Sequence, residues 1–237
     1  MSVNIGIEKC RPFISSELQF ERHSPPPRDA ARRAVVTISR QSGCGAHAVG
    51  GKLAAYLEAH ATDTSCPWQV FDNNLVRNVL AEHKFPRRFA RFMAEDSASE
   101  LADMMDELLG THPPSGVLVN HTVETILRLA ERGNVILIGR GANIITRNLP
   151  HALHVRLVAS LEKRVEHIRS MRDMGKQAAL ELVRREDRGR RRYLKKYFGA
   201  DSEDPLLYHL VLNTDLISYE KAARIIGNIV MSRDSPA

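Results

Sequence analysis

The sequence predicts an α/β fold, a three-layer sandwich built around a mostly parallel five-stranded sheet. Short aliphatic segments alternate along the chain with longer segments of helical periodicity, which is the pattern of helices packed on both faces of a sheet. The run VILIG at 135–139 is apolar throughout, as expected for a central parallel strand covered on both faces. A chain of 237 residues, 43% hydrophobic and 26% charged, can bury a core of that size.

Five segments are predicted to be strands because β-branched and aliphatic residues dominate them. Polar or glycine residues follow most of these segments, and parallel strands would bring those residues to one edge of the sheet, where ligands bind in such folds. In chain order the predicted strands are AVVTIS (34–39), WQVFD (68–72), VILIG (135–139), ALHVRLV (152–158) and HLVLNT (209–214).

Helices are predicted between the strands from the spacing of their apolar residues. After the first strand, Val49, Leu53 and Leu57 recur every four residues and so lie on one helical face. Residues 73–118, rich in Leu, Met, Ala and charged residues, are predicted to form a helical insertion over one edge of the sheet. The remaining predicted helices are 119–132, 161–174, 178–197 and 220–231.

Residues 1–33 show no sustained period and contain SPPPRDAARR, so we expect a flexible N-terminal extension before one folded domain at 34–232. No charged segment followed by an apolar one opens the chain, and no apolar run is long enough to span a bilayer. The three cysteines form no CxxC motif, which fits a reducing compartment and argues against structural zinc. We therefore expect a cytoplasmic protein without a membrane partner, and the sequence leaves its oligomeric state open.

The loop after the first strand, in ISRQSGCGAHAVGGKL, contains Gly43 and Gly45 immediately before a predicted helix. Glycines allow positive φ and a close approach of the backbone, and a helix N-terminus offers N–H groups and a positive dipole end to a phosphate. A P-loop has the pattern Gly-x4-Gly-Lys-Ser/Thr. Aligned with it, Ala46 stands at the lysine and His47 at the magnesium-binding hydroxyl. The loop residues alone therefore leave open a phosphate loop and a tight strand-to-helix turn.

Four motifs follow one another along the chain, each at the end of a predicted strand: TISRQSGCGAHAVGGKLA, VFDNNLV, VILIGRGANIITRNLP and LVRREDRGRRRYLKKYFGADSEDPLLYHLVLNT. They resemble, in the same order, ISR-x-x-GSGG-x-x-IG-x-x-LA, YDRELI, VIVGRGA…L…P and DKxRxxYY…G…DPxxYDLxINT of the cytidylate kinase-like family, a branch of the P-loop nucleoside monophosphate kinases. In that family glycine commonly replaces the P-loop lysine. The resemblance covers about residues 34–230 and implies a P-loop kinase fold, with 73–118 on the acceptor side and a basic lid at 176–205.

The resemblance implies transfer of the γ-phosphoryl group of ATP, with Mg²⁺, to a nucleoside monophosphate, with CMP or dCMP as the first expectation. An acceptor phosphate oxygen would be the nucleophile, so no side-chain base is needed. Nucleotides are the expected partners, ATP and Mg²⁺ the expected cofactors, and no metal-ligating residues of the protein are assigned. Arg40 would supply part of the charge of the missing lysine. The donor phosphates would be held by Arg40, Ser42, Gly43, Cys44, Gly45, Ala46 and His47.

The formal charge of +6 is concentrated at residues 184–196, which hold eight Lys/Arg and two acids. Within this segment Arg184, Asp187 and Arg190 reproduce the Arg-x2-Asp-x2-Arg spacing of the cytidylate kinase lid, which implies a catalytic role. Arginines suit that role because phosphoryl transfer depends on neutralising charge on phosphate oxygens. A solvated helix with i,i+3 and i,i+4 ion pairs and a nucleic-acid-binding strip remain alternatives. The scarcity of aromatic residues among these charges disfavours nucleic acid.

On the acceptor side the resemblance assigns Arg140 and Asp72. Arg140 is similar to the arginine of the family's GRD motif, which reaches the acceptor phosphate, but Gly141 replaces the aspartate here. Asp72 would contact the acceptor nucleotide or a metal-bound water. A structural role for Arg140 and a helix N-cap at Asp72 are the alternatives. Cys44 is expected to be a small packed residue rather than a nucleophile.

Two further functions stay open. A nucleotide-binding regulatory protein of the same fold would explain the absence of the lysine and of the Ser/Thr hydroxyl, which serve the β- and γ-phosphates and Mg²⁺. A nucleic-acid-binding module would use the basic strip at 184–196.

Overall fold

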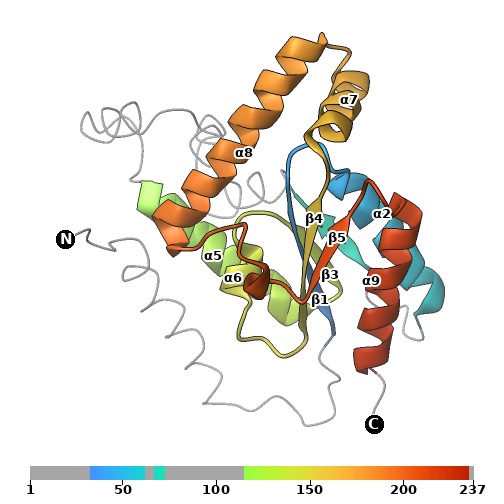
Figure 1. Cartoon of the computed structure of the whole chain (residues 1–237). Helices are drawn as coiled ribbons and strands as arrows, with labels where there is room; N and C mark the ends of the chain where they lie inside the picture. Colours follow the sequence, from blue (N-terminus) through green and yellow to red (C-terminus); the bar gives the residue numbers. More distant parts are fainter. Residues whose placement is uncertain (1–32, 62–66, 73–114, 235–237) are drawn as a thin grey trace.

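The computed structural model describes residues 33–61, 67–72 and 115–234 (Figure 1). The predicted N-terminal extension at 1–33 and helical insertion at 73–118 fall almost wholly outside the described residues. Both therefore stay predictions.

All five predicted strands are present, with bounds within two residues of those expected. They pair in the order β2-β3-β1-β4-β5, and every pairing is parallel, which confirms the predicted α/β architecture. The strands are β1 (Val35–Arg40), β2 (Gln69–Phe71), β3 (Val135–Ile138), β4 (Ala152–Val158) and β5 (Leu210–Asn213).

The central strand β1 sets the register of the sheet. Val35 lies opposite Val135 of β3 on one side and opposite Ala152 of β4 on the other. Because all strands run the same way, the loops that follow β1, β3 and β4 emerge at one edge of the sheet. That edge carries the predicted site.

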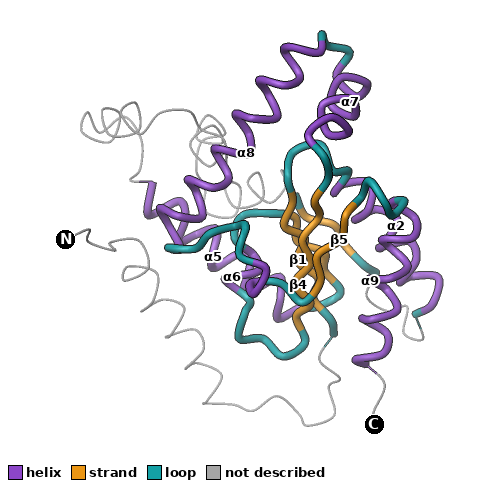
Figure 2. The backbone as a smooth tube through the Cα atoms, in the orientation of Figure 1, coloured by secondary structure: helices purple, strands orange, loops and turns teal. Residues whose placement is uncertain are grey.

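Helices cover both faces of the sheet (Figures 1 and 2). On one face α2 and α9 share an apolar cluster with the strands, and on the other α5, α6 and α8 share a second cluster. Helices α7 and α8 follow each other as a hairpin that projects beyond the sheet (Figure 2). The helices are α2 (Ala46–His60), α5 (Ser115–Arg132), α6 (Ala142–Ile145), α7 (Leu161–Arg172), α8 (Lys176–Phe198) and α9 (Tyr219–Asp234).

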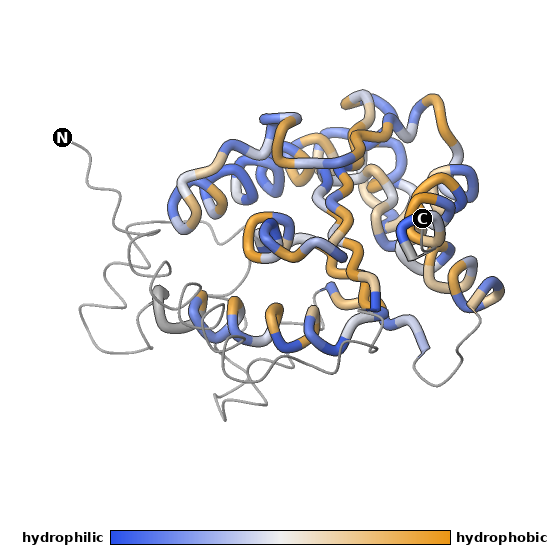
Figure 3. Tube along the Cα trace, turned by 90° about the horizontal axis from the view of Figure 1, so that it is seen from below, coloured by the Kyte–Doolittle hydropathy of each residue, from blue (hydrophilic) through white to orange (hydrophobic). Residues whose placement is uncertain are grey.

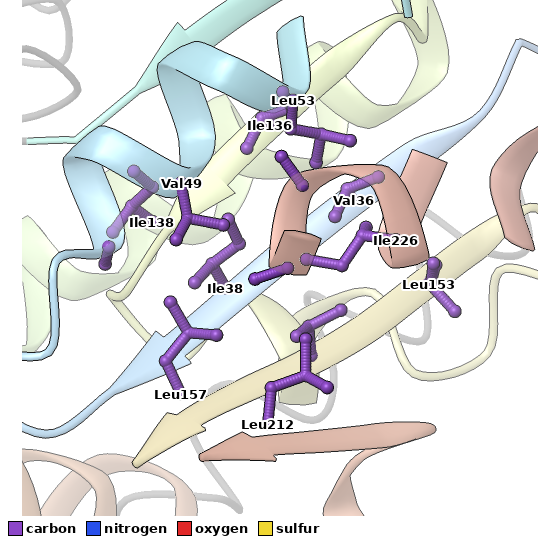
Figure 4. Packing of buried hydrophobic residues seen from close by; sticks show 14 of the residues in the cluster. Val36, Ile38, Val49, Leu53, Ile136, Ile138, Leu153, Leu157, Leu212 and Ile226 are labelled. Atoms are coloured by element: carbon purple, nitrogen blue, oxygen red, sulfur yellow. The ribbon is translucent and has the colours of Figure 1, made fainter. Parts of the chain in front are cut away.

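The core on the α2/α9 face is aliphatic and almost completely buried (Figure 4). Val49, Leu53 and Leu57 of α2 face it, as their four-residue spacing predicts. Apolar residues are correspondingly concentrated on the strands and on the inward sides of the helices (Figure 3). Burial of this kind stabilises the fold by roughly 1.5–3 kcal/mol for each large side chain.

Two short elements were not predicted, namely α6 and the 3₁₀ turn η2 (Pro205–Leu207). Each is too short to show a helical period. Helix α8 runs from Lys176 to Phe198, two residues longer at its start and one at its end than predicted. Within the described ranges, none of the helices combines the length and apolarity that crossing a bilayer requires.

Candidate functional site

The loop between β1 and α2 is enclosed by two later helices. Gly43 has a φ of +85°, and a Cβ there would lie 2.5 Å from the backbone oxygen of Arg164 on α7. Gly45 has a φ of +77°, and a Cβ there would overlap the ring of Tyr219, the first residue of α9. Left-handed backbone and close approach both exclude larger residues. The fold therefore requires glycine at both positions, whatever ligand the loop takes.

Helix α2 begins with an open N-terminus. Gly45 is its N-cap, and no side chain among the described residues caps it. The first backbone bond of the helix runs from the Val49 N–H to the Gly45 oxygen at 2.9 Å, so the N–H groups of Ala46, His47 and Ala48 have no acceptor within the helix. Such amides, at the positive end of the helix dipole, are suited to bind a phosphate. The predicted donor-phosphate role of this loop therefore fits the geometry.

Cys44 packs beneath the loop. Its S–H donates to the carbonyl oxygens of Gln41 at 2.8 Å and Leu157 at 3.3 Å. Burial raises the pKa of the Cys44 thiol to about 11, so the thiol is protonated at neutral pH. Because only the thiolate is a good nucleophile, Cys44 acts as a packed residue here.

Two carboxylates of α8 reach the loop at Ser42. The Ser42 N–H donates to Asp187 Oδ1 at 2.7 Å, and the Ser42 hydroxyl donates to Glu186 Oε2. Carboxylate oxygens thus accept hydrogen bonds from a loop donor of the kind that phosphate oxygens use. The structure therefore brings Asp187, predicted in the lid, directly against the predicted phosphate loop.

Two arginines complete this network. Arg164 Nη1 donates to the Ser42 carbonyl at 3.2 Å and to Asp187 Oδ2 at 2.5 Å. Arg190 donates to Asp187 Oδ1 at 3.4 Å and to Glu186 Oε2 at 3.1 Å. Burial alone would raise the pKa of Glu186, but the Ser42 hydrogen bond and the Arg190 charge lower it below its usual value. The i,i+3 and i,i+4 ion pairs expected of a solvated helix therefore occur, but they lie on the face that contacts the loop.

Arg184 is placed differently from the other two predicted lid residues. It lies exposed on α8, away from the network around Ser42, and does not line the pocket described below. The lid spacing alone could not reveal this, because residues three apart are neighbours on a helix and the spacing does not say which of them are buried. The catalytic role of Arg184 stays a prediction.

Asp72 links the end of β2 to the loop. Its carboxylate lies 2.8 Å from His47 Nε2 and 3.7 Å from Arg40 Nη2. Arg40, at the end of β1, is therefore held by a neighbouring acid. The predicted N-cap alternative for Asp72 concerns a segment outside the described residues.

Arg140 follows β3 and is buried, with a φ of +59°. A left-handed backbone is rare for a residue other than glycine and costs on the order of 1 kcal/mol or more, so strain of this kind is typical of functional positions. The side chain lines the same pocket as Arg40 and Arg190. The structure thus brings the predicted acceptor arginine to the edge where β1, β3 and the lid meet.

Arg40, Arg140 and Arg190 line a pocket of about 330 Å³ at the carboxyl edge of the sheet. Asp72 and loop residues 42–47 are not among the residues that line it. Asp187 and Glu203 are the carboxylates among the described lining residues. A pocket so rich in guanidinium groups is suited to phosphate, because each group can bind it through two hydrogen bonds. Its arginines are Arg40, Arg140, Arg156, Arg164, Arg190 and Arg191.

Five charged residues of this site were not predicted as site residues from the sequence: Arg156, Arg164, Glu186, Arg191 and Glu203. Arg164 and Glu186 stand in helices with many charges, so nothing in the sequence distinguishes them from solvated residues. A signal did exist for Arg156. An arginine inside the largely apolar strand ALHVRLV is expected to be buried, and buried charges are rare unless they are paired.

Comparison with known proteins agrees with this arrangement. A model of the cytidylate kinase-like family matches residues 35–216, which include all five strands, the loop after β1 and the basic helix α8. The predicted resemblance and the predicted kinase-type fold are thereby confirmed.

Two curated relatives are cytidylate kinases of archaea. The protein of Thermococcus kodakarensis is 26% identical over 144 residues, which are 59% of this chain and 72% of that protein. The protein of Methanocaldococcus jannaschii is 29% identical over 107 residues, which are 44% of this chain and 60% of that protein. The second match thus spans less than two thirds of the relative.

Among solved structures, an uncharacterized protein from Eubacterium ventriosum ATCC 27560 has a similar fold. Its TM-score is 0.62 at 16% sequence identity, with 85% of this chain and 99% of that chain covered. At this identity the likeness concerns the fold alone.

Proposed function

The chain belongs to the cytidylate kinase-like family. We therefore propose that it transfers the γ-phosphoryl group of ATP to a nucleoside monophosphate, with CMP or dCMP as the first expected acceptor. The observation that carries the proposal is the arginine-lined pocket between the loop, α6 and α8. It lies at the carboxyl edge of a parallel sheet, where such folds bind their ligands.

The loop would hold the donor phosphates through the N–H groups of Ala46 and His47 at the open N-terminus of α2. Arg164 and Arg190 would neutralise the charge that develops on the transferred group, which is the main requirement of this chemistry. Arg140 would hold the acceptor phosphate in the same pocket. A phosphate oxygen is already a nucleophile. The residues of the site therefore need only position the two nucleotides and neutralise the charge on their phosphates.

Mg²⁺ usually binds phosphate oxygens, water and one or two carboxylates rather than a cage of protein ligands. The carboxylate of Asp72, beside the loop, would accept a hydrogen bond from a metal-bound water. Its contacts with His47 and Arg40 would keep the carboxylate in place. When bound with ATP, Mg²⁺ supplies positive charge to the β- and γ-phosphates.

One observation favours a second candidate, a regulatory protein that binds nucleotides without efficient transfer. Asp187 accepts the Ser42 N–H, and α8 therefore already occupies one donor of the loop. Ala46 and His47 also replace the lysine and the hydroxyl that serve the phosphates and Mg²⁺ in a P-loop. Such a protein would bind nucleotides but not turn them over.

A coupled assay of ADP release from ATP with CMP, dCMP, UMP and AMP tests the kinase, and calorimetry of each nucleotide tests binding. We expect turnover with at least one acceptor and a loss of roughly 100-fold or more in kcat on Arg190→Ala. Arg185→Ala is the matched control, since Arg185 is exposed on the same helix. Binding without turnover of any acceptor would replace the kinase with the regulatory protein, and absence of both would reject both candidates.

A further inference from the structure

Arg156 is a buried arginine toward the carboxyl end of β4. It lies on β4 opposite Ser39 of β1, and its side chain is 5% exposed. A guanidinium in such a place is costly unless hydrogen bonds and an opposite charge compensate its lost hydration. Its neighbours Val155 and Leu157 point into the aliphatic core on the other face of the sheet, whereas Arg156 lines the pocket. Arg156 therefore calls for an explanation other than packing.

Its partners fix the guanidinium from several directions. Arg156 Nη1 donates to Ser39 Oγ at 3.2 Å and lies 3.4 Å from the hydroxyl of Tyr208, over whose ring the guanidinium stands at 5.5 Å. The Tyr208 hydroxyl donates in turn to the Ser202 carbonyl at 3.0 Å. Arg156 Nη2 donates to Glu203 Oε1 at 2.6 Å. This arrangement holds one carboxylate, that of Glu203, at a defined place.

The loop that carries Glu203 is also ordered by local bonds. The Glu203 N–H donates to Asp201 Oδ1 at 3.0 Å, and the Asp204 N–H donates to the Asp201 carbonyl at 3.2 Å. The side chain of Asp204 then caps η2 by accepting from the Leu206 N–H at 2.9 Å. Glu203 is thus positioned from its own backbone and from Arg156 across the sheet.

The charges of the pocket indicate what this carboxylate faces. Glu203 is 50% exposed, lines the pocket, and its Oε2 has no hydrogen-bond partner among the described residues. A carboxylate repels phosphate, so Glu203 is unsuited to the charged end of a ligand. It accepts hydrogen bonds from neutral N–H or O–H donors instead. The other carboxylate of the described lining, Asp187, is already bonded to Ser42 and Arg164.

We propose that Glu203, positioned by Arg156, is a specificity-determining residue that binds a hydrogen-bond donor on the nucleoside part of the acceptor. The proposal rests on the proposed function and deepens it: the pocket takes an acceptor with a phosphate at one end and an amino or hydroxyl donor at the other. The exocyclic amine of the base and the ribose hydroxyls are the two donors of this kind on a nucleoside monophosphate. Arg156 touches neither and acts only through Glu203.

Glu203→Gln tests the proposal because it keeps the size of the side chain and removes its charge. A hydrogen bond to a charged group contributes enough binding free energy that we expect the acceptor KM to rise roughly 10- to 100-fold, while the KM for ATP stays unchanged. The Tm should fall, because buried Arg156 loses its opposite charge, so the kinetics are measured at a temperature where the variant is folded. Glu220→Gln is the matched control, since that exposed carboxylate pairs with Lys52. Steady-state kinetics with CMP, dCMP and UMP identifies the donor. A lost preference for CMP over UMP indicates the amine, and a lost preference for CMP over dCMP indicates the 2′-hydroxyl.

Arg156→Lys tests the positioning role. It keeps the positive charge but loses the planar guanidinium group, so we expect a smaller rise in the acceptor KM and no rise in the KM for ATP. Combined with Glu203→Gln, it should raise the acceptor KM little further. Unchanged acceptor KM values in Glu203→Gln, or an equal rise in the KM for ATP, would overturn the proposal and leave the kinase intact. Absence of turnover and binding with every nucleoside monophosphate in the wild type would instead overturn the proposed function and this inference with it.

Discussion

The two faces of the sheet bury different kinds of residue. On β4, Leu153, Val155 and Leu157 point into the aliphatic core beneath α2 and α9. Their neighbours His154 and Arg156 point to the opposite face, where they meet polar partners instead. Both faces are buried, so the difference is one of chemistry rather than of exposure to solvent.

The polar residues of the second face gather toward the carboxyl ends of the strands. Val35, Val135 and Ala152, at the amino ends, still belong to an apolar cluster there. Ser39 and Arg156 stand at the other end and line the pocket. The α2/α9 face is apolar throughout, whereas the pocket face gives up part of its apolar burial for polar groups that line the pocket. Substitutions on the two faces should therefore be separable by experiment.

Arg140→Ala is expected to have the largest effect on the pocket face. Removing an arginine that binds a transferring or accepting phosphate lowers kcat/KM by about a thousandfold. The Tm should change little, because no apolar burial is lost. Steady-state kinetics with ATP and the preferred acceptor, together with thermal unfolding, measures both quantities.

Arg147→Ala is the control for that variant, since Arg147 is exposed just after α6. A variant Arg140→Ala with normal kinetics and a clearly lowered Tm would give Arg140 the structural role left open by the sequence. The comparison between the faces would then fail at its most important residue.

Leu153→Ala should lower the free energy of unfolding by about 2–5 kcal/mol, because a side chain 2% exposed leaves a cavity in the α2/α9 core. The kinetic constants should stay close to those of the wild type at temperatures where the variant is folded. Urea denaturation at pH 7.5, followed by circular dichroism, measures the loss. A change in acceptor KM without loss of stability would show that this face also shapes the site.

His154→Gln tests the polar face through the pH dependence of the protein's stability. Burial, with the nearby charge of His209 and Arg233, lowers the pKa of His154 to about 4 from 6.5. Below pH 6.5 the unfolded chain binds a proton that the folded protein does not, so the wild type loses stability as the pH falls toward 4, by about 2 kcal/mol at pH 5. The variant should lose much less between pH 7.5 and pH 5.

Urea midpoints at these two pH values provide the measurement for His154. His209, whose pKa burial and Arg233 also lower, leaves some acid sensitivity in the variant. Parallel curves for the wild type and the variant would contradict the assignment. Leu153→Ala, one residue away on the other face, serves as the control that shifts the curve equally at both pH values.

The difference between the two faces also explains which features of the fold and of the site could be predicted from the sequence. The apolar runs predicted all five strands, because a strand covered on both sides is apolar whichever face is considered. Arg156 stands out within ALHVRLV as a charged residue in a buried strand, but the sequence does not indicate its partner. Its partner Glu203 lies 47 residues away, and only the parallel pairing of β4 with β5 brings the two together.

The predicted lid on α8 shows a different limit of prediction from the sequence. Asp187 and Arg190 were named from their spacing and are indeed turned toward the loop, because they lie on the inward face of α8. Arg184 shares the spacing but is exposed. A pattern fixed along the sequence does not specify which side of a helix packs, since that depends on the apolar residues Leu182, Val183 and Leu194.

The contact of Tyr219 with Gly45 has a consequence for how the protein is made. The loop belongs to an early segment, yet one of its walls is the first residue of the last helix, 174 positions later. On the ribosome, the loop is therefore synthesised long before the residue that encloses it. Strand β1 can pair only after β3 and β4, its two neighbours in the sheet, have been synthesised. Because domains complete their long-range pairings late, the candidate site takes shape only as synthesis ends.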